Sequence, residues 1–169
     1  MDLAAFYSLM SITCFTLVGL WWTVLERHPE WKVDRGRRLL AGGVYLSFLL
    51  PGLMSTFAQV DSGNPIVWRT SFSLAALIGM VATLRLVSVE RGRGHHGLFR
   101  RFRWVVAVIY AVILALAVVP ATAALVGGTA LQAASVALIL LVVLAHGLAW
   151  EFMMEPEDDV AVTAGEDVS

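Results

Sequence analysis

Charged residues are scarce in this chain: Asp, Glu, Lys and Arg make up 15% of its 169 residues, whereas a soluble domain carries about 25%. Hydrophobic residues make up 59%, more than one small core can bury in water. Hydrocarbon is the solvent that accommodates such a composition. The sequence therefore predicts an integral protein of the lipid bilayer and excludes an ordinary soluble domain.

Signatures of catalysis and metal binding are also missing. The one cysteine, Cys14, excludes an intrachain disulfide and a multi-cysteine metal site. The chain has no GxSxG, HExxH or Walker motif, and no acid lies deep in an apolar segment. His95 and His96 lie in a loop whose arginines repel cations, and a bis-histidine haem needs a second histidine inside the bundle beside His146. The sequence therefore favours a non-enzymatic protein without a cofactor.

Basic residues are confined to two loops. Ten of the twelve lie in residues 26–38 (ERHPEWKVDRGRR) and 90–104 (ERGRGHHGLFRRFRW). Arginine at the bilayer centre costs about 2.5 kcal/mol or more, so both loops stay outside the hydrocarbon. Both are short and adjoin apolar segments, which does not indicate a nucleic-acid partner. The positive-inside rule places both in the cytoplasm, the N-terminus outside and the C-terminus inside. The short loops between the segments favour a location in the bacterial plasma membrane.

Five apolar segments are long enough to cross a bilayer as helices. Five of the six tryptophans fall at their expected ends, where indole rings prefer the headgroup layer. The tail, residues 151–169, holds seven acids and no base, and we predict that it is disordered. The predicted fold is all-α, a five-helix transmembrane bundle with short loops over residues 3–25, 39–60, 66–88, 102–125 and 130–150.

One candidate site is a helix break in the second segment, at Ser47, Pro51 and Gly52. Proline removes a helical hydrogen bond and leaves the carbonyl of Ser47 without its usual donor. Broken helices near the midplane expose backbone to substrates in many transporters. A packed kink without a ligand is the alternative interpretation, and it is the one we favour. Either interpretation predicts a bend at Pro51.

The second candidate site is a group of polar residues that the predicted topology places near the cytoplasmic membrane face. Such a group can bind an anionic headgroup, or respond to proton uptake by a histidine. The competing interpretation is that the arginine extends its guanidinium to lipid phosphate while the histidine bonds a neighbouring helix. The residues are Glu26, Arg27, His28, Arg85, His146 and Glu151, with Glu90 at a similar depth.

Small residues recur every four positions in two segments, a spacing that lets helices approach closely in lipid. Packing within one subunit is the favoured interpretation, and a homo-oligomer face or a membrane-protein partner is the alternative. The two series are Ser71, Ala75, Gly79 and Thr83, and Ala107, Ala111 and Ala115.

These observations favour a small non-enzymatic membrane protein, either a subunit of a larger membrane complex or an oligomeric module. The first alternative is a transporter or channel-like protein that uses the Pro51 kink with Arg69 or Arg85. The second alternative is a membrane enzyme or lipid binder at the cytoplasmic headgroup layer.

The topology can be tested by cysteine labelling. In a variant whose only cysteine is introduced at position 62, a membrane-impermeant reagent added outside should react, because that turn has no basic residue. A cysteine introduced at position 95 should be protected in intact cells and react after permeabilisation. Labelling of position 95 but not of position 62 from outside would reverse the topology.

Overall fold

The fold was analysed in a computed structural model that describes residues 2–33, 35–60, 65–90, 103–119, 121 and 128–154. These residues form helices and contain no strand, which confirms the predicted all-α class. The helices are α1 (Leu3–Arg27), α2 (Glu30–Val33), α3 (Arg35–Val60), α4 (Pro65–Glu90), α6 (Arg103–Val118) and α7 (Ala130–Met154).

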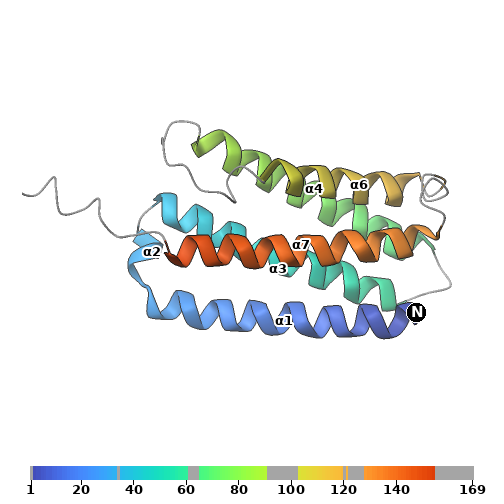
Figure 1. Cartoon of the computed structure of the whole chain (residues 1–169), viewed down its shortest axis with the longest axis horizontal. Helices are drawn as coiled ribbons and strands as arrows, with labels where there is room; N and C mark the ends of the chain where they lie inside the picture. Colours follow the sequence, from blue (N-terminus) through green and yellow to red (C-terminus); the bar gives the residue numbers. More distant parts are fainter. Residues whose placement is uncertain are drawn as a thin grey trace, which may run out of the picture.

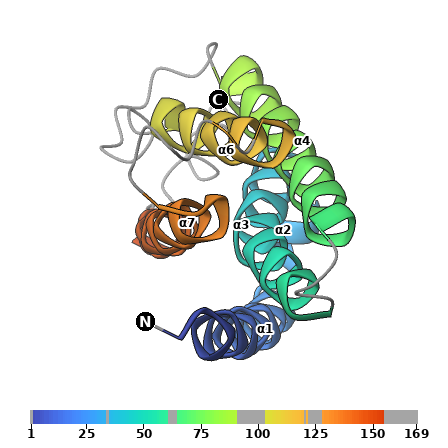
Figure 2. The same cartoon turned by 90° about the vertical axis from the view of Figure 1, so that its right-hand side faces the viewer.

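The five long helices run back and forth along one axis (Figure 1). Seen along this axis, α1, α3, α4 and α6 form an arc, and α7 lies on its concave side (Figure 2). Helix α3 packs against both α1 and α4, and α7 contacts α3, α6 and α1. We call the end of the bundle that carries α2 the basic face, because the first basic loop lies there.

Four helices, α1, α3, α4 and α7, are long and apolar enough to cross a membrane. Helix α6 is apolar but has only 16 residues. It ends at Val118 and not at the predicted residue 125. Pro120 follows two residues later, and helices commonly end before a proline because its ring disfavours helical backbone in the preceding residue. Pro120 and its predicted modest bend lie outside the described residues.

Two other boundaries differ from the predictions. Helix α3 begins at Arg35 rather than at residue 39, so its first turn lies in the predicted basic loop. Helix α7 continues to Met154, which makes the first four residues of the predicted disordered tail helical. Phe152 explains the extension, because its ring is buried against the aromatic residues of α1 and α2. Residues 155–169 lie outside the described residues.

At the end of the bundle opposite the basic face, polar side chains cap the N-termini of two helices. The carboxylate of Asp2 accepts hydrogen bonds from the backbone N–H of Ala4 and Ala5 at the start of α1. At the start of α7, the Gln132 amide oxygen accepts from the backbone N–H of Thr129, and the Thr129 hydroxyl accepts from that of Gln132. This reciprocal pair is a capping box, which satisfies donors that have no partner within the helix.

The two series of small residues have different surroundings. On α4, Ala75 and Gly79 are buried, and a Cβ atom at Gly79 would lie 2.5 Å from Cε1 and 2.7 Å from Cε2 of Tyr110 on α6. On α6, by contrast, Ala111 and Ala115 are exposed. Gly79 of α4 thus makes room for the Tyr110 ring, whereas Ala111 and Ala115 of α6 face outward.

Gly79→Ala should therefore lower the free energy of unfolding by about 1–3 kcal/mol, the usual cost of overpacking. The added methyl group must displace the Tyr110 ring. Gly42→Ala on α3 is the matched control, because nothing lies within 4 Å of its Cβ position. Thermal unfolding in detergent, followed by circular dichroism, measures both. Equal stability of the two variants would contradict this packing.

Candidate functional site

The predicted helix break lies inside a continuous helix. Pro51 is fully buried within α3. The hydroxyl of Ser47 donates to the carbonyl of Gly43 at 2.8 Å. A Cβ atom at Gly52 would lie 3.0 Å from Cβ of Cys14, so this glycine allows α1 to lie directly against α3. The bend at Pro51 and a functional role for the break stay predictions.

A polar contact joins α1 and α3 one turn beyond Gly52. The Thr56 hydroxyl donates to the Gly52 carbonyl at 2.9 Å, and its oxygen lies 2.7 Å from that of Ser11 on α1. In this arrangement the Ser11 hydroxyl donates to Thr56. The contact links the two helices and gives each hydroxyl a partner within the protein.

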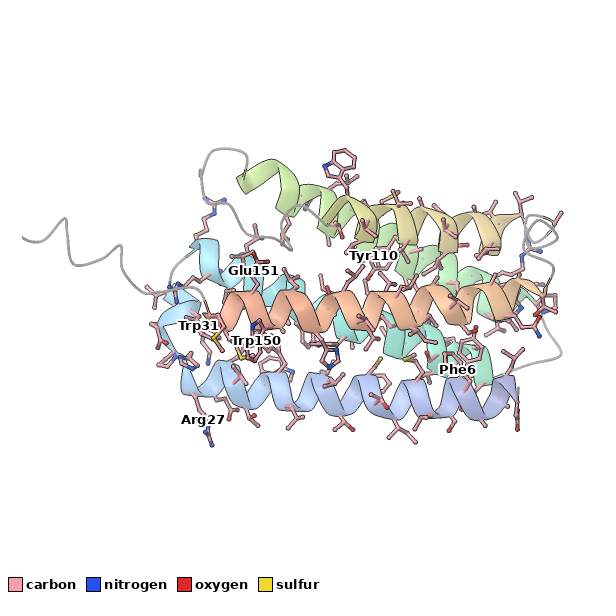
Figure 3. The ribbon with its side chains drawn as sticks, viewed as in Figure 1. Phe6, Arg27, Trp31, Tyr110, Trp150 and Glu151 are labelled. Carbon is pink, nitrogen blue, oxygen red and sulfur yellow. The ribbon has the colours of Figure 1, made fainter. Side chains whose placement is uncertain are left out.

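The α1 members of the predicted polar group lie at the basic face. Glu26 and Arg27 are exposed, and Arg27 points away from the bundle (Figure 3). His28 stacks on Trp31 with ring centroids 4.2 Å apart, and its Nδ1 lies 2.8 Å from a carboxylate oxygen of Glu30. The pKa of the Glu30 carboxyl is lowered, first by a hydrogen bond from its own backbone and then by the His28 side chain.

Arg85 and His146 lie on other helices of the bundle. Arg85 is exposed on α4, and α3 lies between α4 and α1 (Figure 2). His146 is exposed on α7, where its Nδ1 lies 2.8 Å from the carbonyl oxygen of Val142 and its ring meets Phe48 edge-on at 5.2 Å. The helix order thus separates Arg85 from Glu26, Arg27 and His28.

Glu151 has a different environment from the other members of the group. It is half-buried near the end of α7, and its Oε2 atom is buried without a hydrogen-bond partner within the described part of the chain. In Figure 3 it lies on the side of α7 toward α6, as Tyr110 does, whereas Trp150 lies on the side toward α1. An ionised carboxylate buried in this way requires a donor.

An aromatic cluster at the junction of α1, α2 and α7 was not expected from the sequence. Trp21, Trp31 and Phe152 are buried together, with ring centroids 4.7 to 6.5 Å apart. The indole N–H of Trp21 donates to the carbonyl of Ala41 at 3.1 Å. From the sequence, Trp31 was expected in the first basic loop and Phe152 in the disordered tail. The sequence did hold one signal: Ala145, Ala149 and Phe152 are four and three residues apart, which places them on the same side of a continued helix.

Arg69 lies at the opposite face, near the start of α4, and holds the end of α6. Its Nε donates to the carbonyl of Ala117 and its Nη2 to the carbonyl of Val118, both at 2.8 Å. The last carbonyls of a helix have no partner within that helix. A planar guanidinium can satisfy two of them together. Arg69, which the transporter interpretation invoked, is therefore engaged in a structural contact.

A cavity lies among α3, α4, α6 and α7. This cavity has a volume of about 50 Å³, is partly open and is mostly apolar. Gly43 and Gly79 contribute backbone to its wall, and Ser47, Thr83 and Tyr110 carry its only side-chain hydroxyls. The remaining lining residues are Leu46, Leu50, Ala82, Leu86, Val106, Leu141, Leu144, Ala145 and Leu148.

The cavity exists because the helices around it do not all pack against one another. Helix α7 packs against α3 and α6, but α4 and α7 make no extensive contact among the described residues. An apolar cavity of this kind excludes water and accepts apolar matter. Surrounded by lipid, it is suited to part of a hydrocarbon chain. The cavity could not be predicted from the sequence, because a glycine in an apolar helix indicates close packing of helices as readily as a cavity wall.

Among the described residues, no group of three or more His, Cys, Asp or Glu side chains could hold a metal ion. Comparison with known proteins gave no match to a family model, a curated protein or a solved structure. The class of protein is defined by the fold itself: the described part of the chain is all-helical and includes four helices of membrane-spanning length and composition.

Removal of the Arg69 side chain tests its structural role. Arg69→Met should lower the free energy of unfolding by about 2 kcal/mol, because it removes two hydrogen bonds from a charged donor. Arg69→Lys should recover only part of the loss, since an ammonium lacks the planar fork. Arg27→Met, at an exposed arginine that points away from the bundle, is the matched control. Thermal unfolding in detergent distinguishes them, and an unchanged Arg69→Met variant would refute the cap.

Proposed function

We propose that this chain is a non-enzymatic, five-span protein of the bacterial plasma membrane that holds part of the acyl chain of a membrane lipid in the cavity among α3, α4, α6 and α7. The cavity is the observation that carries this proposal, because it combines enclosure, an apolar lining and a position inside an apolar bundle. A lipid chain is the apolar ligand that a bilayer supplies at high concentration.

The contacts of α6 support the fifth span. Its 16 residues measure about 24 Å at 1.5 Å per residue, a little less than the ~30 Å of a typical hydrocarbon core. A bilayer accommodates a short span by local thinning. Arg69, near the start of α4, binds the last two carbonyls of α6. Helix α6 thus ends at the level at which α4 begins.

The charge distribution supports the orientation. The first basic loop includes α2 and the first turn of α3, and the second follows α4. Helix α4, which precedes the second loop, ends toward the side of the bundle that carries α2 (Figure 1). With this end in the cytoplasm, the N-terminus lies outside and the acidic tail inside.

A second candidate function is an oligomeric module or a subunit of a membrane complex. The observation that favours it is the exposed face of α6, where Ala111 and Ala115 lie beside Val108 and Val112. Small residues there would let another helix approach closely. A transport function has less support, because the described cavity lining contains no charged side chain to compensate a permeating ion.

Native mass spectrometry of the full chain, released from micelles containing phospholipid, tests lipid binding. Wild type should retain about one phospholipid, whereas Ala82→Leu should lose most of it, because the larger side chain enters the cavity. The matched control is Ala111→Leu, which adds the same atoms on the exposed face of α6. Retention of the lipid by a folded Ala82→Leu variant would refute the proposal.

The same spectra report the oligomeric state. A wild-type dimer that becomes a monomer in Ala111→Leu would support the second candidate, and a monomeric wild type would remove its homo-oligomeric form.

A further inference from the structure

Glu151 continues the α7 side of the cavity toward the basic face. Leu144 and Leu148 line the cavity, and Glu151 follows Leu148 by three residues, about 4.5 Å along the helix axis. Residues three and four apart lie on the same side of a helix. Figure 3 shows Glu151 and Tyr110 on the same side of α7. The carboxylate therefore lies just beyond the end of the cavity.

Two tryptophans place this end of the cavity at the headgroup layer. Trp150 directly precedes Glu151 and is 61% exposed. On the other wall, Trp104 lies two residues before Val106, which lines the cavity, and is 57% exposed. Exposed indole rings at helix ends prefer the level of the lipid headgroups. An acyl chain in the cavity would therefore have its headgroup beside Glu151.

The carboxylate of Glu151 is placed to accept a hydrogen bond from a donor group of a bound lipid. Its Oε2 atom is buried and has no partner within the described part of the chain. A buried carboxylate oxygen without a donor is costly, and a charged donor offsets the cost best. A primary ammonium offers three N–H groups, whereas a trimethylated ammonium offers none.

We propose that Glu151 receives the ammonium group of a lipid with a primary amine, phosphatidylethanolamine in chemical class, whose acyl chain occupies the cavity. This inference rests on the proposed lipid-binding function and adds the selectivity for the headgroup. The negatively charged phosphate of the same zwitterionic headgroup is attracted by the positive charge of the basic face. Arg35, Arg37 and Arg38 lie there, in the first turn of α3.

The experiment is native mass spectrometry of the full chain with equal amounts of phosphatidylethanolamine, phosphatidylcholine and phosphatidylglycerol that share the same acyl chains. Wild type should retain phosphatidylethanolamine in preference to the others by about tenfold, as a hydrogen bond to a charged group allows. Glu151→Gln should retain a lipid but lose this preference. Glu26→Gln, at an exposed carboxylate of the basic face, should keep it.

A second measurement needs no variant. Stepwise N-methylation of the ethanolamine headgroup should reduce retention by wild type at each step, because each methyl group replaces one N–H donor. Equal retention across this series would overturn the inference, as would a full preference for phosphatidylethanolamine in Glu151→Gln. Retention of lipid without headgroup preference would leave the proposed function intact and refute this inference alone. Absence of any retained lipid in wild type would refute the proposed function itself.

Discussion

The structure depends on one constraint: in hydrocarbon, every backbone N–H and C=O group must find its partner within the protein. Helices satisfy this requirement along their length but leave groups unpaired at their ends. The chain supplies side-chain partners at the face opposite the basic one. Asp2 caps α1, the Thr129–Gln132 pair caps α7, and Arg69 binds the last carbonyls of α6. The Arg69 contact also joins two helices, so it ties the short α6 to α4.

Close approach between helices is arranged by single glycines. Gly52 allows α1 to lie against α3 at Cys14, and Gly79 accommodates the Tyr110 ring of α6. With α3 in the middle of the arc, α1 and α4 are held on opposite sides of it. Helix α7 then covers the concave side without packing extensively on α4. The cavity is the consequence, and its mostly apolar lining is the basis of the proposed lipid-binding function.

The basic face combines this apolar space with the polar groups of the headgroup layer. Trp21, Trp31 and Phe152 form a buried aromatic cluster that holds α2 and the end of α7. The extension of α7 through this cluster keeps Glu151 on a rigid helix at the end of the cavity. A lipid that binds there would meet an apolar wall, a carboxylate and a positively charged surface. That combination distinguishes the cavity from the lipid-facing surface elsewhere.

The sequence by itself determined the all-α class and the approximate positions of the apolar helices, but not the start of α3 or the ends of α6 and α7. Composition and the length of apolar runs depend only on neighbours along the chain. It also identified Glu151 as one member of a polar group. Only the tertiary structure decided that α3 separates Arg85 from the α1 residues, that Arg69 caps α6 and that Phe152 extends α7. In lipid, apolar surfaces are satisfied by either protein or solvent. Hydrophobicity therefore cannot specify which helices become neighbours, and side-chain shape and polar contacts between distant residues make that choice.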